Sequence, residues 1–372
     1  MLKNIVKDLK PSSTLAINET SKKLEEEGKK IFKFGFGQSP FKVPEDVVDE
    51  LKNNAYQNKY LPMQGLKELR ESVAKYSSKK KNYNYKSHNV IIGPGSKELM
   101  FLLHVIFDGE IILPAPSWVS YAPQAILGRN KIQILQTERE NNWFPSGEQI
   151  EKMILKNKDK NYLLFLNSPN NPSGQVCDKL EEISEIAKKY NLWVVEDAAC
   201  GFGSKYKNKH VGTFGDTGAF SFHPRKSITT GEGGMITTNN DELAEKIRSM
   251  RDHGAAMSDY QRHHGARPYL LAEHPYAGYN YRMTDIAAGL GISQLSRLDS
   301  FVSTRHIIAE RYNKELLTMP IKLPKVIKES YSSYHLYVIR LKLEEINKTH
   351  QQIHDELIEL GVMVNLHYIP VY

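Results

Sequence analysis

Apolar runs of strand length alternate with amphipathic helical patterns from about Val43 to Leu295. The runs Tyr162–Leu166 and Leu192–Val195, for example, are separated by the helical pattern Asp178–Tyr190. This alternation is typical of βαβ units, in which parallel strands form a sheet covered by helices. We therefore predict an α/β fold with a largely parallel sheet sandwiched by helices.

The two ends of the chain follow a different pattern. A helix is predicted from Ser13 towards Gly28, and near the other end we expect a long helix over Arg297–Leu317, a strand over Tyr334–Arg340 and a helix over Thr349–Leu360. A chain of 372 residues exceeds the usual ceiling for a single hydrophobic core. We predict a large domain over 41–296 and a smaller α+β domain built from 1–40 and 297–372.

Three polar residues stand shortly after strand-like runs. Asn171 lies in the turn Asn167–Gly174, Asp197 follows the run ending at Val195, and Lys226 precedes the glycine-rich turn Thr229–Gly234. Ligands of open α/β sheets bind at the carboxyl ends of the strands, so the three residues are expected to converge.

The chemistry of the three groups matches the demands of pyridoxal phosphate. A buried carboxylate such as Asp197 stabilises a protonated pyridine ring, which withdraws electrons from the reacting carbon. A desolvated lysine such as Lys226 is nucleophilic enough to form a Schiff base with the cofactor aldehyde. Taken singly, each residue has an ordinary structural interpretation, as a helix cap, a turn or a solvated lysine. Their order and spacing favour the cofactor site.

Several long strings then resemble known families. Strings in the second half resemble the DegT/StrS family of sugar aminotransferases: Glu196–Ala199, Val211–Asp216, Phe220–Met235, Arg251–Gly254, Gly278–Ile286 and Val364–Pro370. Strings in the first half resemble class I/II amino-acid aminotransferases: Phe36–Gln38, Tyr60–Arg70, Pro116–Trp118 and Asn167–Gly174. Both resemblances imply a fold type I, pyridoxal-phosphate-dependent aminotransferase with catalytic residues Lys226 and Asp197.

A phosphate site is predicted at Gly95, Ser96 and Lys97, where a glycine turn opens a helix and points backbone N–H groups at an anion. The resemblance adds Ser221 as a further donor to the phosphate. A simple helix cap is the alternative for Ser96.

The resemblance also implies two contacts to the cofactor ring. Trp118 matches the aromatic residue that stacks on it, with a core tryptophan as the alternative. Asn171 matches the class I contact to the phenolic oxygen. It could replace the glutamine that the sugar family usually has where this chain has Cys200.

Residues from a second subunit are implied as well, since these families complete the site in a homodimer. Tyr60 and Asn280 match residues that reach the neighbouring cofactor phosphate. Arg282, Arg340 and His367 are candidate substrate contacts. Guanidinium groups suit anionic substrates, although a surface arginine is an equally good interpretation of Arg282.

Composition excludes few classes. The formal net charge of +7 gives no reason to expect nucleic acid, and no stretch has the length and apolarity of a membrane span or signal peptide. Cys177 and Cys200 are too few for a disulfide framework, and the histidines lack a metal-ligand spacing. We therefore expect a cytoplasmic protein that binds no metal.

The combined prediction is an aminotransferase that moves an amino group from an amino-acid donor, by family habit glutamate, to a keto compound. A nucleotide-linked keto sugar is the preferred acceptor. An amino-acid/keto-acid aminotransferase is the alternative within the fold, and a cofactor-binding regulator without turnover is the alternative outside enzymes. The chain stops at Tyr372, where sugar-family chains typically continue, so the C-terminal end of the small domain is expected to be incomplete.

Overall fold

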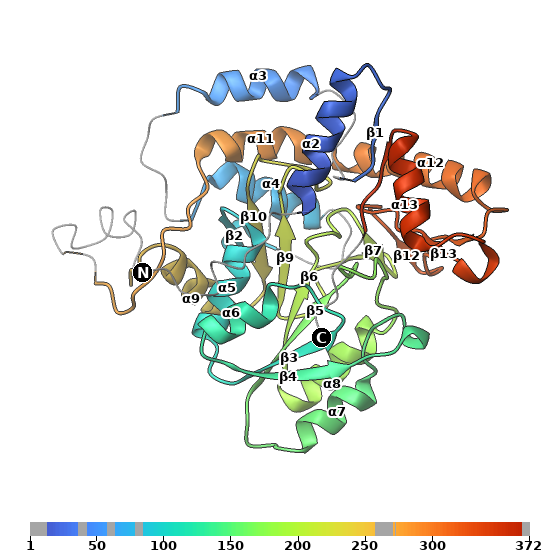
Figure 1. The fold of residues 1–372 in the computed structure, drawn as a ribbon. Coiled ribbons are helices and arrows are strands. Elements are labelled where there is room, and N and C mark those ends of the chain that lie inside the picture. The colour runs from blue at the N-terminus through green and yellow to red at the C-terminus, as the bar shows by residue number, and fades with distance from the viewer. Residues whose placement is uncertain are drawn as a thin grey trace, which may run out of the picture.

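A seven-stranded, mostly parallel sheet forms the centre of the molecule (Figure 1). The computed structural model describes residues 13–35, 43–57, 64–78, 85–256, 271 and 273–366. In spatial order the strands are β2 (Val90–Gly93), β10 (Gly234–Thr238), β9 (Thr217–Ser221), β6 (Trp193–Asp197), β5 (Tyr162–Asn167), β3 (Glu110–Ala115) and β4 (Lys131–Gln136). β10 runs in the opposite direction to the other six strands of this sheet. The predicted fold class is confirmed.

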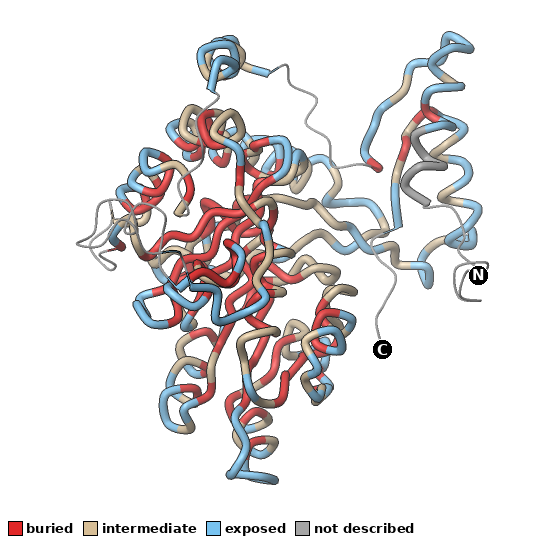
Figure 2. The backbone as a smooth tube through the Cα atoms, turned by 90° about the vertical axis from the view of Figure 1, so that its left-hand side faces the viewer, coloured by how far each residue is buried: buried red, intermediate tan, exposed pale blue. Residues whose placement is uncertain are grey.

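Helices cover both faces of this sheet. One face carries α5 (Ser96–Ile106), α6 (Tyr121–Leu127) and α9 (Asp241–Arg251), and the other carries α4 (Lys67–Ser78), α7 (Gly147–Leu155), α8 (Leu180–Tyr190) and α11 (Asp285–Leu295). Neighbouring strand residues point to opposite faces, so Val194 packs in the α7/α8 layer and Val195 in the α5/α9 layer. Figure 2 shows the buried residues concentrated in the sheet between these layers.

Side chains at the helix starts satisfy orphan N–H groups. The side chain of Ser146 accepts from Gln149 in a capping box before α7, and Asn240 caps α9 by accepting from Leu243. Such caps fix where each helix begins relative to the preceding strand.

The remaining elements lie mostly at the two ends of the chain. They are α2 (Ser13–Glu26), β1 (Phe32–Lys33), α3 (Glu45–Asn54), η1 (Ser87–Asn89), η2 (Arg139–Asn141), β7 (Lys205–Tyr206), β8 (Lys209–His210), α12 (Leu298–Glu315), β11 (Ile321–Lys322), β12 (Ser330–Tyr331), β13 (Arg340–Leu341), η3 (Leu343–Glu345), α13 (His350–Glu359) and β14 (Val362–Met363). β1 pairs in parallel with β14, so segments from the two ends of the chain lie side by side (Figure 1). None of the helices in the described ranges could cross a membrane.

The strand expected over Tyr334–Arg340 is wrong except at its last residue, where β13 begins. Tyr334 has φ of +45°, in the left-handed region that no strand residue adopts. Ser333 is buried and bonds to Ser204 and to the backbone of Cys200 instead of to a neighbouring strand. Docking on the 200–204 loop has therefore overridden the apolar pattern.

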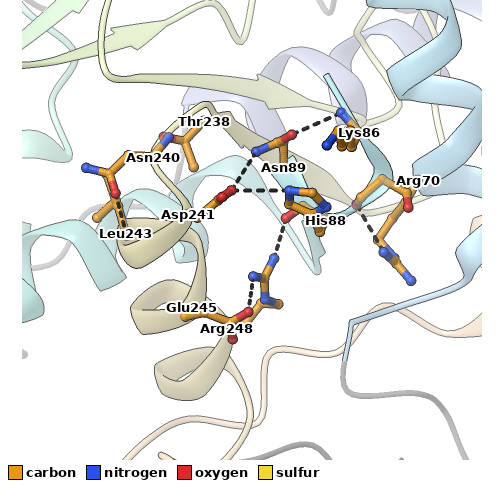
Figure 3. Close-up of polar contacts among 11 residues, drawn as sticks. Arg70, Lys86, His88, Asn89, Thr238, Asn240, Asp241, Leu243, Glu245 and Arg248 are labelled. Atoms are coloured by element: carbon orange, nitrogen blue, oxygen red, sulfur yellow. Dashed lines mark hydrogen bonds and ion pairs between the residues drawn. The ribbon is translucent and has the colours of Figure 1, made fainter. Parts of the chain in front are cut away.

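Buried arginines hold the turn that precedes β2 (Figure 3). Arg70 of α4 donates to Ser87 O at 3.0 Å, and Arg248 of α9 donates to His88 O and to the Glu245 carboxylate. Asn89 closes the network by donating to Asp241 at 3.3 Å. These bonds tie helices on opposite faces to one edge strand of the sheet.

Replacing Arg248 by Met should lower the free energy of unfolding by about 1–3 kcal/mol, because the carbonyl of His88 then loses the donor that the buried Arg248 supplies. Lys246 is the matched control, since it lies on the same helix in an exposed pair with Glu242. Lys246→Met should change stability by less than about 0.5 kcal/mol. Chemical denaturation of both variants checks this, and equal stabilities would contradict it.

Candidate active site

The carboxyl ends of three adjacent strands bring the predicted residues together. In the sheet register Asn167 of β5 lies opposite Asp197 of β6, and Asp197 lies opposite Ala219 of β9. Lys226 follows in the loop after β9. Parallel strands present these ends at one edge, where open α/β sheets bind ligands.

Asp197 is a fully buried carboxylate with two protein donors. Tyr121 of α6 donates its phenol to Oδ2, and the N–H of Ala199 donates to Oδ1 at 2.9 Å. Burial raises the pKa of the Asp197 carboxyl above its usual value, while the bonds from Tyr121 and Ala199 and the charge of Lys226 act in the opposite direction. Such a group gains from a cationic ligand that would stabilise its charged form.

Lys226 directs its amine into the same region. Its Nζ donates to Cys200 Sγ at 3.3 Å and lies 3.5 Å from Nε2 of His335. Burial raises the pKa of the Cys200 thiol, and the nearby Lys226 opposes this shift. The lysine backbone is held too, because Arg305 of α12 donates to Lys226 O and to Ser227 Oγ, both at 3.4 Å.

Asn171 leaves its side-chain oxygen available for a ligand. Asn167 fixes the backbone here, accepting from Asn171 N–H at 2.6 Å and donating its own amide to Asp197 O at 2.8 Å. The side-chain oxygen of Asn171 is buried and has no hydrogen-bond partner in the described part of the chain. Buried polar atoms are rarely left in this state, so the position fits a residue that meets a bound polar group.

The predicted phosphate residues share the neighbouring part of this edge. Gly95 caps α5, and Ser96 and Lys97 begin the helix, whose free N–H groups favour an anion. Gly234 pairs with Ser221, and a Cβ added to Gly234 would lie 2.2 Å from Ser96 N. Only glycine permits this approach, which places Ser221 beside the start of α5.

Trp118 lies next to both groups of residues. Its ring packs edge-on against Tyr121 at 5.5 Å between centroids, and Lys97 Nζ lies 5.7 Å from the ring centroid of Trp118. Through Tyr121 the tryptophan is linked to Asp197. The donors and acceptors present therefore fit pyridoxal phosphate, with an acid for its ring nitrogen, an amide, an amine and an anion site.

The other predicted site residues lie on other segments of the chain. Asn280 is exposed and forms a bridge with Asp252, and Arg282 donates to Asp252 at 2.9 Å. Arg340 is exposed on β13. Tyr60 and His367 lie outside the described residues.

Three neighbours of the site were not predicted from the sequence: Tyr121, Arg305 and His335. Tyr121 follows Trp118 by only three residues in the chain, so its closeness in sequence could have pointed to it as a neighbour of the site. His335 and Arg305 carry no such local signal, since they are 109 and 79 residues from Lys226 in the chain.

Among the residues that the structure describes, no group of three His, Cys, Asp or Glu side chains could hold a metal ion. Cys177 and Cys200 are both free and buried.

Tyr121→Phe should raise the dissociation constant for pyridoxal phosphate by about tenfold or more, because a hydrogen bond to a charged group contributes about 1.5–3 kcal/mol. Without this donor, less remains to oppose the rise in the pKa of Asp197 that burial causes, so the charged carboxylate is less stable. Tyr162 is a matched control, a buried tyrosine of β5 whose hydroxyl donates to Asn157 O at 3.2 Å. Fluorescence titration should show unchanged affinity for Tyr162→Phe, and equal losses in both variants would contradict the role of Tyr121.

The buried carboxyl of Glu196 should make the stability of the fold depend on pH. Burial raises the pKa of its carboxyl from 4.5 to about 7, opposed by N–H groups of the 212–215 loop. Between pH 4.5 and 7 the folded chain therefore binds more protons than the unfolded chain. Its contribution to stability is full below pH 4.5 and is lost as pH rises to about 7, by about 3 kcal/mol in all.

Glu196→Gln should remove this part of the slope, measured by denaturation at several pH values. The same change at exposed Glu148 should leave the slope as it is. A slope unchanged by Glu196→Gln would contradict the assignment.

Comparisons with known proteins agree with this geometry. The chain is 32% identical over 329 residues to GDP-perosamine synthase of Escherichia coli O157:H7, a match that covers 86% of this chain and 84% of that protein. Against several other curated relatives the match spans only about half of their length.

Two solved structures share the fold. Helicobacter pylori PseC, an aminotransferase involved in the biosynthesis of pseudoaminic acid, superposes with a TM-score of 0.74 at 24% identity over 92% of this chain and 86% of that one. Aspartate aminotransferase from Thermotoga maritima gives a TM-score of 0.69 at 20% identity, over 98% of this chain and 90% of that one. The predicted fold type I architecture is thereby confirmed.

The profile of the DegT/DnrJ/EryC1/StrS aminotransferase family matches residues 50–372. Pyridoxal phosphate is the cofactor of this family, as expected from the residues. With the fold, the strand-end residues and the match to residues 50–372 in agreement, the chain belongs to the DegT/DnrJ/EryC1/StrS aminotransferase family.

Proposed function

We propose that this chain is a pyridoxal-phosphate-dependent aminotransferase that transfers an amino group from an amino-acid donor to the keto group of a nucleotide-linked sugar. The observation that carries the proposal is the convergence of Asn171, Asp197 and Lys226 at adjacent strand ends. Membership of an aminotransferase family supports the reaction type.

Each of the three residues has a distinct role in the proposal. Lys226 Nζ would hold the cofactor, and its free amine would carry the proton at the reacting carbon. Asp197 would hold the ring nitrogen in its protonated form, and Asn171 would donate to the phenolic oxygen. When bound, pyridoxal phosphate supplies the electron-withdrawing ring that accepts charge from the reacting carbon.

The cofactor phosphate would be held by Ser96, Lys97 and Ser221, together with the N–H groups at the start of α5. Trp118 would stack on the cofactor ring. Neighbouring strand β10 supports this arrangement, because Gly234 brings Ser221 against the helix start.

The acceptor class follows from the relatives. The names of two relatives include nucleotide sugars. One is GDP-perosamine synthase, 32% identical to this chain, and the other is a UDP-amino-sugar transaminase of Campylobacter jejuni, 33% identical. L-Glutamate is the proposed donor. The buried, free thiols fit the reducing cytoplasm in which we place the protein.

A homodimer is proposed in which Asn280 and Tyr60 reach the partner's cofactor phosphate. Asn280 is exposed in the single subunit, which leaves its side chain accessible to a second subunit. The division into a large domain over 41–296 and a small domain over 1–40 and 297–372 is likewise a proposal, supported by the pairing of β1 with β14.

An amino-acid/keto-acid aminotransferase is the second candidate, favoured by Arg305, a guanidinium beside the Lys226 backbone that could serve a substrate carboxylate. Turnover with keto acids but not with keto-sugar nucleotides would select it. Bound cofactor without any transamination would select a regulator instead.

Lys226→Ala should abolish covalent capture of pyridoxal phosphate and slow transamination by at least about a thousandfold, because both the covalent attachment and the proton carrier are lost. Lys179→Ala is the control, since the side chain of this lysine donates to Asn141 Oδ1 at 2.9 Å and lies outside the site. The measurement is amine transfer from L-glutamate to a panel of nucleotide-linked keto sugars and simple keto acids. Full turnover by Lys226→Ala would contradict the proposal.

A further inference from the structure

We propose that His335 is a positioning residue, which accepts a hydrogen bond from the Lys226 amine and aims this amine at the reacting carbon. This inference rests on the proposed function of Lys226. The observation behind it is the 3.5 Å separation between His335 Nε2 and Lys226 Nζ, a contact made by a residue from the C-terminal part of the chain.

The backbone around His335 is built to hold this direction. Tyr334, directly before it, has φ of +45°, a conformation that a non-glycine residue keeps only where its surroundings enforce it. One such contact is local, because the Tyr334 N–H donates to Ser332 Oγ at 3.1 Å. Strained backbone conformations of this kind are concentrated at functional sites, where the exact position of a neighbouring side chain outweighs the conformational cost.

Two further hydrogen bonds attach this segment to the 200–204 loop, which follows β6. Ser333 is fully buried, with its N–H donating to Ser204 Oγ at 2.8 Å and its hydroxyl donating to Cys200 O at 2.9 Å. Cys200 is the residue whose thiol accepts from Lys226 Nζ. The same short loop therefore positions the thiol on one side of the amine and, through Ser333, the imidazole on another.

Helix α12 fixes the segment from outside. His306 lies 2.7 Å from Ser332 O through Nε2 and stacks on Tyr331 at 4.2 Å between ring centroids. Arg305, its neighbour in α12, holds the Lys226 backbone. One turn of helix thus secures both the segment that carries His335 and the lysine that His335 contacts.

The arrangement suits a lysine that must change roles. While it carries the cofactor, Nζ is bonded covalently, but after displacement it is a free amine on a flexible four-carbon chain. Proton transfer requires that this amine remain near the reacting carbon. An imidazole nitrogen within reach can accept one N–H of the free amine and leave its lone pair directed at the proton to be moved, so His335 itself gains and loses no proton.

The experiment measures how fast hydroxylamine displaces the cofactor from Lys226 in the holoenzyme, followed by the visible absorption of the bound cofactor. Hydroxylamine needs no carboxylate or sugar subsite, so the rate reports on attack at the cofactor and departure of the lysine without any contribution from substrate binding. His335→Phe keeps a ring of similar shape without the acceptor and should slow displacement about tenfold. His335→Gln, whose amide can reach the same position, should stay within about threefold of the unchanged protein.

His223→Phe is the matched control. This histidine lies three residues before Lys226, but its Nε2 faces Glu232 at 3.7 Å, and displacement should stay within about twofold. Cofactor affinity is measured in parallel for each variant. A loss of affinity with an unchanged displacement rate would show that His335 only supports the fold, and a His335→Phe rate within twofold of the unchanged protein would overturn the inference.

Failure of the proposed function is recognised separately. Borohydride reduction of the unchanged holoenzyme, followed by peptide mass measurement, should place the cofactor on Lys226. Attachment elsewhere would refute the role of Lys226 and the inference with it. Attachment at Lys226 with normal displacement in His335→Phe would refute only the role of His335.

Discussion

The carboxylate of Asp197 is the constraint on which the site depends. It is held out of water at the end of a central strand, with Tyr121 and the N–H of Ala199 as its donors. Burial of a charge is costly unless hydrogen bonds and an opposite charge compensate it. The two neutral donors and the nearby charge of Lys226 supply part of this compensation, and a protonated ring nitrogen of a bound cofactor would add to it.

The sheet determines which other groups can share that environment. Because β5, β6 and β9 are parallel neighbours, their carboxyl ends bring Asn167, Asp197 and the loop to Lys226 to one edge. The antiparallel β10 adds Gly234, which lets Ser221 approach the start of α5. The C-terminal part of the chain contributes His335, which reaches Lys226 because the 332–334 segment docks on the 200–204 loop.

Much of this architecture was predictable from the chain. Strand-length apolar runs and their polar ends predicted the sheet and the convergence of Asn171, Asp197 and Lys226, because a strand buried on both faces leaves a continuous apolar run in the sequence. Tyr334–Arg340 also looks like a strand, yet the buried bonds of Ser333 hold it in another conformation. His335 and Arg305 could not be predicted, because their contacts with Lys226 join segments far apart in sequence. The roles of the site residues stay predictions.

Nitrogen NMR of the chain loaded with pyridoxal phosphate labelled with ¹⁵N in the ring tests the central claim most directly. If Asp197 pairs with the ring as we describe, the spectrum should show a protonated ring nitrogen near neutral pH, and Asp197→Ala should abolish that protonation. An unprotonated ring nitrogen in the unchanged protein, or a protonated one that survives Asp197→Ala, would contradict the account.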